Sequence, residues 1–149
     1  MVYGNGDIYS GSWLSGEKSG KGTYEYSNGD AYIGEWKADL KDGSGIFEME
    51  NGDRYEGEWK EGRKYGSGIY YFQNGDVYEG YFIDGQRNGK GIYIWVDKSC
   101  YNGDWEKDRM HGKGVYYPKE ENGPFLAGYF ENDEFVRAEE ENPEESIKN

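Results

Sequence analysis

The sequence has very few of the residues that build most catalytic and metal sites. Its 149 residues include one histidine, His111, one cysteine, Cys100, and three prolines. One cysteine excludes an internal disulfide, which fits a reducing compartment, and one histidine excludes a histidine-based metal cluster. His111 stands in a predicted turn and Cys100 in a predicted strand, and neither has a visible activating partner. We therefore expect no catalytic residue, no metal site, no cofactor and no enzymatic activity.

Aliphatic residues and positive charges are also scarce. Leu, Ile, Val and Phe together number 22, below the roughly 20% of residues under which a highly charged chain is expected to be disordered. The chain has 17 Lys and Arg against 30 Asp and Glu, a net charge of −13. An acidic surface repels phosphate, so we expect no nucleic-acid partner, and electrostatic adsorption to anionic lipid is disfavoured. We find no signal peptide and no apolar run long enough to span a bilayer.

What the chain does have is a 23-residue repeat rich in aromatic residues and glycine. Sixteen tyrosines and five tryptophans supply large amphipathic surfaces, and most keep a register that a disordered sequence has no reason to maintain. A fixed period of this size is typical of stacked supersecondary units. The equivalent positions are Tyr9, Tyr32, Tyr55, Tyr78 and Tyr101; Gly11, Gly34, Gly57, Gly80 and Gly103; Trp13, Trp36, Trp59, Phe82 and Trp105; Gly22, Gly45, Gly68, Gly91 and Gly114; and Tyr24, Phe47, Tyr70, Tyr93 and Tyr116.

The repeat predicts an all-β fold. Within each unit, Tyr-x-Gly-x-Trp and Gly-x-Gly-x-Tyr each place their marked residues on one face of a strand. We expect the glycines to leave room for neighbouring rings to lie over the sheet. The predicted structure is an elongated, single-layer, twisted antiparallel sheet of stacked hairpins, about 50 Å long.

Two kinds of turn connect the predicted strands. The turn within a unit runs from Leu14 to Ser19 and through the equivalent segments, and its third position carries Gly or Asp, which tolerate positive φ. Between units, Asn-Gly at 5–6, 28–29, 51–52 and 74–75 is a strong hairpin signal. The aspartates that follow Asn-Gly match no known calcium loop, and we expect them to hydrogen-bond the turn backbone.

The repeat also sets the expected boundaries. Residues 1–8 form a partial repeat or N-terminal cap in this interpretation. The register shifts around an insertion at 118–124, so 124–142 is expected to hold a degenerate strand and a short capping helix. That helix would begin at Asn132 or Asp133 and run through Phe135 to about Glu141, followed by a disordered acidic tail at 143–149. The five complete repeats are predicted at 9–31, 32–54, 55–77, 78–100 and 101–123.

From residue 3 to about 130 the sequence resembles the MORN repeat (membrane occupation and recognition nexus). Small proteins made only of MORN repeats, of the retinophilin type, are the nearest likeness. The resemblance implies an elongated antiparallel sheet and a scaffolding role in the cytoplasm, at the cytoskeleton or the membrane cortex. It also implies a concave aromatic groove that receives a partner peptide or helix, including a motor-protein segment in some members, and dimers that form end to end.

We expect a partner to contact the aromatic face. A variable stripe lies two residues beyond the closing aromatic of each unit, on the same face as the rings. The predicted contact residues are the stripe, Tyr26, Met49, Phe72 and Trp95, together with Tyr9, Tyr32, Tyr55, Tyr78, Trp36 and Trp59. The opposite face mixes Ile33 and its equivalents with charges. There Glu35, Glu58 and Asp104 occupy equivalent positions, with about 10 Å from one unit to the next, and are expected to be solvated rather than a catalytic carboxylate pair.

Three functions fit these features. The leading hypothesis is a non-enzymatic scaffold that holds a protein segment in the aromatic groove. The alternatives are a phospholipid-recognition module that inserts apolar side chains, and a MORN appendage of a larger protein. An unpaired strand at a sheet end would also permit a homodimer.

Overall fold

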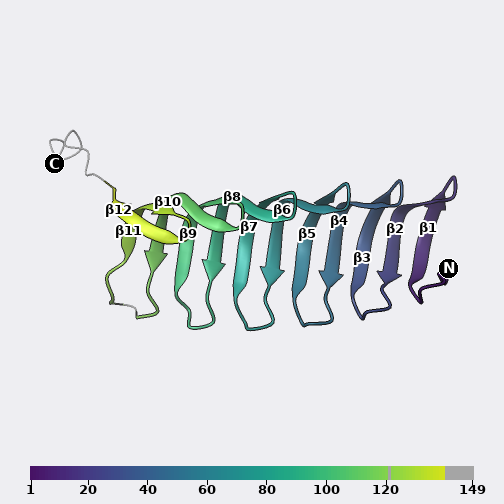
Figure 1. The fold of residues 1–149 in the computed structure, drawn as a ribbon, viewed down its shortest axis with the longest axis horizontal. Helices are drawn as coiled ribbons and strands as arrows, with labels where there is room; N and C mark the ends of the chain where they lie inside the picture. Colours follow the sequence, from purple (N-terminus) through teal and green to yellow (C-terminus); the bar gives the residue numbers. More distant parts are fainter. Residues whose placement is uncertain (121, 140–149) are drawn as a thin grey trace.

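The protein is one open sheet of antiparallel strands, and the computed structural model describes residues 1–120 and 122–139. In these residues each strand pairs only with its sequence neighbours, so the sheet order runs from β1 to β12 without a crossover. Figure 1 shows the strands side by side along the long axis, which confirms the predicted elongated single layer. The strands are β1 (Ile8–Leu14), β2 (Glu17–Glu25), β3 (Ala31–Lys37), β4 (Leu40–Glu48), β5 (Arg54–Lys60), β6 (Arg63–Tyr71), β7 (Val77–Ile83), β8 (Gln86–Ile94), β9 (Cys100–Glu106), β10 (Arg109–Tyr117), β11 (Leu126–Glu131) and β12 (Glu134–Ala138).

In each unit, two glycines on neighbouring strands leave space for an aromatic ring. Gly34 of β3 lies opposite Gly45 of β4, and a Cβ built on Gly45 would overlap the Tyr32 ring. The Tyr32 hydroxyl donates a hydrogen bond to the Glu35 carbonyl oxygen at 2.8 Å. This confirms that the glycines leave room for the rings. The same arrangement recurs at Tyr9, Tyr55, Tyr78 and Tyr101.

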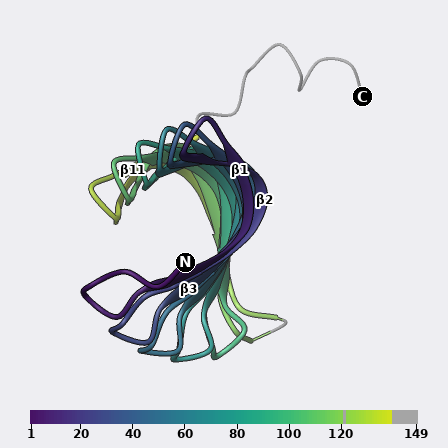
Figure 2. The same cartoon turned by 90° about the vertical axis from the view of Figure 1, so that its right-hand side faces the viewer.

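The sheet is curved across its short direction, and Figure 2 shows it as a C when seen along the long axis. Each unit contains a bulge, because β3 has one residue between Gly34 and Trp36 where β4 has three between their partners. A bulge bends the strand that contains it. Gly43 lies within the bulge at a φ of 98°, which favours glycine. The Glu35 carboxylate accepts a hydrogen bond from the Ser44 backbone nitrogen there.

Ring contacts show the direction of this curvature. In an extended strand, residues four apart lie about 13 Å from each other. The ring centroids of Tyr32 and Trp36 are only 5.0 Å apart, and those of Tyr55 and Trp59 are 5.2 Å apart. The strands therefore curl toward the face that carries the rings, which becomes the concave face.

The positive φ predicted at the turns is confirmed, but the turn within a unit is shorter than the predicted Leu14–Ser19, because β1 ends at Leu14 and β2 begins at Glu17. Ala38 and Asp39 join β3 to β4 with φ values of 49° and 67°, and this pair of positive values is typical of a type I′ hairpin. The residue at the third turn position has a positive φ in every unit; these residues are Gly16, Asp39, Gly62, Gly85 and Asp108. Between units, Gly29 has a φ of 101°, and Lys98 takes the equivalent position in the departing fifth unit with a φ of 76°.

The predicted C-terminal helix is wrong in the part that the structure describes. Glu134–Ala138 is strand β12, paired antiparallel with β11. Asn132 and Asp133 have φ values of 48° and 71°, so they form the same two-residue turn as Ala38 and Asp39 rather than a helix N-cap. The sequence from Leu126 is therefore a shortened sixth hairpin. The rest of the predicted helix beyond residue 139 and the predicted disordered tail lie outside the described residues. Within residues 1–120 and 122–139, no helix is long and apolar enough to cross a membrane.

Candidate functional site

Most of the concave aromatic face is buried within the sheet itself. The five repeat tyrosines have no exposed surface, and Trp36 and Trp59 are 6% and 8% exposed. Each tyrosine packs edge-on against the aromatic ring at the tryptophan position of its own unit and of the next, which is Phe82 in unit four and Phe130 in the last hairpin. The Tyr32 centroid thus also lies 5.4 Å from that of Trp59. We correct the predicted contact set accordingly. Tyr9, Tyr32, Tyr55 and Tyr78 form the core, because a side chain without exposed surface cannot touch a second protein.

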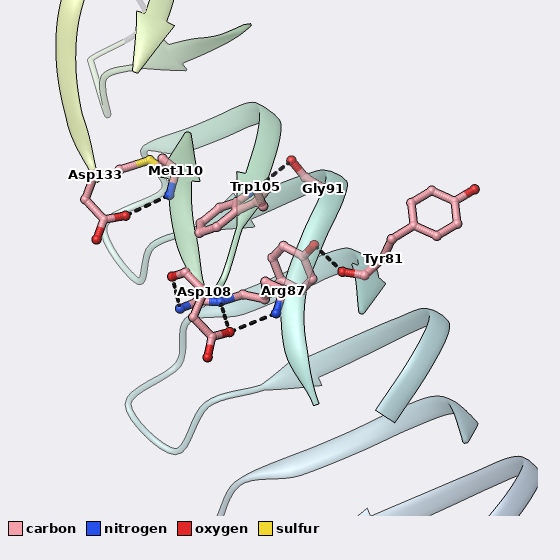
Figure 3. A network of polar contacts seen from close by, with 8 residues as sticks. Tyr81, Arg87, Gly91, Trp105, Asp108, Met110 and Asp133 are labelled. Atoms are coloured by element: carbon pink, nitrogen blue, oxygen red, sulfur yellow. Dashed lines mark hydrogen bonds and ion pairs between the residues drawn. The ribbon is translucent and has the colours of Figure 1, made fainter. Parts of the chain in front are cut away.

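The tryptophans join each unit to the one before it. The indole nitrogen of Trp59 donates to the Gly45 carbonyl oxygen at 3.1 Å, and Trp36 and Trp105 make the equivalent bonds to Gly22 and Gly91. Figure 3 shows the bond of Trp105. Trp36 and Trp59 therefore have a structural role, with only a small edge left for any partner.

The variable stripe keeps part of its surface. Tyr26, Met49, Phe72 and Trp95 are half-buried. The rings of Tyr26, Phe72 and Trp95 contact the closing aromatics of the repeat, with centroid distances of 4.5 Å from Tyr26 to Tyr24 and 4.8 Å from Trp95 to Tyr93. The structure thus separates two groups that the sequence placed together, a buried core and a partly open row beside it.

A row of cations on the concave face was missed by the sequence analysis. Lys18, Lys41, Lys64 and Arg87 are 23 residues apart. The three lysines lie beside the tryptophan of their own hairpin, as in the pair Trp36–Lys41, and Arg87 lies beside Phe82. The Lys41 ammonium lies 5.0 Å from the Phe47 centroid and 5.3 Å from that of Trp59, within the range of cation–π attraction. Their spacing was a visible signal, because a cation recurs at this position in four consecutive units.

Two of the four cations have a carboxylate from the next hairpin. Oδ1 of Asp39 lies 3.2 Å from the Lys18 ammonium and accepts a hydrogen bond from the Lys18 backbone nitrogen at 2.8 Å. Oδ1 of Asp108 has the same relationship to Arg87, at 3.2 Å from Nε and 2.8 Å from the backbone nitrogen. Figure 3 shows this second pair.

The other two cations have glycine at the corresponding turn position, Gly62 for Lys41 and Gly85 for Lys64. Within the part of the chain that the structure describes, neither ammonium lies within 4.0 Å of a carboxylate oxygen. Burial among the rings lowers the pKa of both lysines. Lys41 and Lys64 are thus partly desolvated cations without an ion-pair partner within 4.0 Å among the described residues, although Asp30 lies close enough to act on Lys41 and Asp108 and Asp53 close enough to act on Lys64.

The aspartates after Asn-Gly bind backbone, as predicted, but in the neighbouring unit. Asp76 accepts from the Val96 backbone nitrogen at 2.9 Å and from the Tyr93 hydroxyl at 2.6 Å. Asp7 does the same with Ser27 and Tyr24. These hydrogen bonds lower the pKa of the Asp7 carboxyl, with the largest effect from the Tyr24 hydroxyl. The aspartates therefore fasten successive turns to each other.

The repeated carboxylates on the opposite face also have a structural role. Glu35, Glu58 and Asp104 accept backbone hydrogen bonds in the bulge from Ser44, Ser67 and Lys113. The prediction that these carboxylates are simply solvated is therefore wrong, because they also bind the backbone. Among the described residues, no group of three or more His, Cys, Asp or Glu is placed to hold a metal ion, and burial raises the pKa of the Cys100 thiol.

Comparison with known families follows the same repeats. The MORN repeat matches residues 9–31, 32–54, 55–77, 78–100 and 101–119. The chain belongs to the MORN repeat family. Members of this family are generally non-catalytic, and the repeat suggests protein or membrane interaction.

Comparisons with individual proteins add less. No curated protein matches the chain. Among solved structures, the chain is similar to the SAS-4 (dCPAP) TCP domain of Drosophila melanogaster, solved in complex with a proline-rich motif of Ana2 (dSTIL). The identity is 16%, the TM-score is 0.39, and the match covers 87% of this chain and 81% of the other. At this TM-score, the likeness carries no argument about function.

Proposed function

We propose that the protein is a non-enzymatic MORN scaffold that holds a segment of another protein along its concave aromatic face. The carrying observation is the partly open stripe of Tyr26, Met49, Phe72 and Trp95. These side chains vary between units, whereas the buried tyrosines and glycines that build the sheet do not. Aromatic side chains that already pack against neighbouring rings make good binding contacts, because they lose little conformational entropy when a partner binds.

Loss of the stripe tests this proposal. A triple variant with Tyr26, Phe72 and Trp95 changed to alanine should lose its protein partners in affinity capture from the native cell, followed by mass spectrometry and by titration of the recovered partner. The matched control changes Tyr71, Tyr81 and Tyr117 to alanine. These are exposed aromatics that flank concave-face residues along their strands and so point to the opposite face. Equal capture by both triple variants would overturn the proposal.

Membrane recognition is the second candidate. Apolar insertion by the stripe, rather than charge, would have to supply the affinity, because the net charge of −13 opposes anionic headgroups. Flotation with neutral and anionic vesicles at low salt separates the two functions. Flotation that depends on the stripe, without protein capture, would favour the membrane function.

The sheet end and the cellular location are further parts of the proposal. Trp13 of β1 is 41% exposed, because none of the residues that the structure describes lies against it as Gly22 lies against Trp36. Residues 1–3 cover only part of this edge, through the bridge between Val2 and Ile8. We propose that this end pairs with a second copy, and light scattering at increasing protein concentration tests this dimer. We also propose that the scaffold acts in the cytoplasm at the cytoskeleton or membrane cortex, and imaging of the tagged protein tests this location.

A further inference from the structure

The two paired cations show which chemical group these positions accept. In both pairs a single carboxylate oxygen receives the backbone N–H and lies beside the cationic side chain of the preceding unit. The oxygen belongs to Asp39 or Asp108, each with a φ near 66° to 67°. Each position is therefore a small receptor for one carboxylate, and in these two units the chain fills it with its own aspartate. Asp133 occupies the equivalent place at the Met110 backbone nitrogen, where methionine stands in place of the cation.

At the other two positions the receptor lacks that aspartate. Gly62 and Gly85 have φ values of 84° and 82°, so the turn has the same form. A Cβ built on Gly85 meets nothing within 4 Å, and one on Gly62 meets only a Leu40 methyl at 3.7 Å. Next to Gly85, a hollow of about 170 Å³ is lined by Lys64 and Phe72 and also by the ion-paired residues Arg87 and Asp108. Space, a partly desolvated ammonium and the variable stripe therefore lie next to each other here.

We propose that Lys41 and Lys64 receive two carboxylates from an acidic segment of a partner protein. This inference rests on the proposed function, because it specifies the chemistry of the segment that the stripe contacts. The two lysines are one unit apart, and a unit of two strands spans about 10 Å. Side chains three residues apart in a polyproline II segment lie on one face at about 9 Å. Such a segment running along the sheet presents one carboxylate to each lysine and its intervening side chains to the stripe.

A carboxylate fits these positions better than a lipid phosphate. The receptor is matched by the two carboxylates that the chain itself places there, and it lies beside the rings of the concave face. The net charge of −13 repels an acidic segment at long range, but that repulsion is screened beyond about 8 Å at physiological salt. A desolvated cation gains most from an anion that reaches it directly.

The glycine turns allow a direct test. The probe is a fluorescein-labelled peptide of Glu-Pro-Leu repeated five times, and its control is the same peptide with Gln in place of Glu. Fluorescence anisotropy with the full chain should show at least tenfold tighter binding of the Glu peptide. Gly62→Asp with Gly85→Asp should weaken that binding at least tenfold, because the new aspartates fill both receptors. Gly16→Asp adds the same charge in the same turn, where no cation of an earlier unit faces it, and should leave binding unchanged.

A second double variant tests the inference independently, in case the glycine substitutions disturb the fold. Lys41→Met with Lys64→Met uses the residue that stands at the equivalent position of unit five, Met110, and should also weaken binding at least tenfold. Equal binding of the Glu and Gln peptides, no binding of either, or unchanged binding by both double variants would overturn the inference. So would a loss of flotation with anionic vesicles in these variants without any peptide binding. If capture of the cellular partner needs the stripe but not the lysines, the proposed function stands and this inference fails.

Discussion

Arg87 and Asp108 are joined through both their backbones and their side chains. One carboxylate oxygen of Asp108 accepts from the Arg87 backbone nitrogen at 2.8 Å and from Nε at 3.2 Å, while Nη2 donates to the Asp108 carbonyl oxygen at 2.8 Å. The two residues are 21 positions apart and belong to successive hairpins (Figure 3). The pair therefore fastens unit four to unit five.

Asp108→Asn should lower the free energy of unfolding by about 0.5–1 kcal/mol. The substitution keeps an acceptor and a residue that tolerates positive φ but removes the charge, and the pair is partly exposed, which limits its value. Urea denaturation measures the change. Asp84→Asn is the control, since Asp84 and Arg63 form an exposed pair 3.8 Å apart and should contribute almost nothing. Equal effects of the two substitutions would contradict the prediction.

Gly45→Ala should destabilise the fold by about 1–3 kcal/mol, as expected when an extra methyl group is forced into a packed interior. The new Cβ would overlap the Tyr32 ring, which has no exposed surface and cannot move outward without leaving its hydrogen bond to the Glu35 carbonyl. Thermal and urea denaturation measure the loss. Gly4→Ala is the matched control, because nothing lies within 4 Å of its new Cβ. A Gly45→Ala protein as stable as the control would remove the argument that glycine makes space for the ring.

Phe47→Tyr should stabilise the protein by about 0.5–1.5 kcal/mol, the net value of a typical hydrogen bond. Tyr24, Tyr70 and Tyr93 each donate a hydroxyl proton to an aspartate of the preceding inter-unit turn, at 2.6–2.7 Å. Phe47 occupies the equivalent place above Asp30 without a hydroxyl. The reverse change, Tyr70→Phe, should cost a similar amount or more, because it removes a partner from Asp53. If both substitutions shift the urea midpoint in the same direction, the hydrogen bond from the ring hydroxyl to the aspartate does not stabilise the fold as predicted.

Stability should fall as the pH drops below about 4, the ordinary pKa of an aspartate. The pKa of Asp7 is lowered in the folded protein by the Tyr24 hydroxyl and the Ser27 backbone nitrogen, and the pKa of Asp39 is lowered by Lys18. A carboxyl whose pKa is lowered on folding stabilises the fold above its unfolded pKa, and that stabilisation is lost as the pH falls through the folded pKa. Denaturation from pH 6 to pH 2 measures the slope. Asp7→Asn should reduce it, and an unaltered slope would show that Asp7 is not linked to folding.

The architecture could be predicted because one pattern is repeated five times. The Tyr-x-Gly-x-Trp motif and the Asn-Gly turns identify strand, face and turn in each unit, and each copy supports the others. The concave shape was implied only by the family resemblance. The bulge that bends the strands could not be predicted from the residues, because Gly43 looks like any glycine in a strand until its φ is known. Asn132 and Asp133 were misjudged because the same residue types favour helix N-caps and positive-φ turns.

The candidate site was only partly visible in the sequence for two reasons. Alternation along a strand assigns a side chain to a face, but Tyr32 and Tyr26 share a face while only Tyr26 keeps exposed surface. The row of cations was not predicted, because the strongly negative net charge directed attention away from basic residues. Lys18, Lys41, Lys64 and Arg87 nevertheless keep the repeat spacing. Which of them has a counter-charge depends on the next hairpin, at Asp39, Gly62, Gly85 and Asp108, and this relationship requires the register between strands.

The connection of each hairpin only to its immediate neighbours makes the protein extensible. Inserting one further 23-residue copy between two central units would lengthen the sheet by about 10 Å and add one interface of the kind already present. Cooperative stability in such linear arrays grows with the number of interfaces. The length of the sheet is therefore set by the number of copies, and the charge at each turn by the choice of Gly or Asp there.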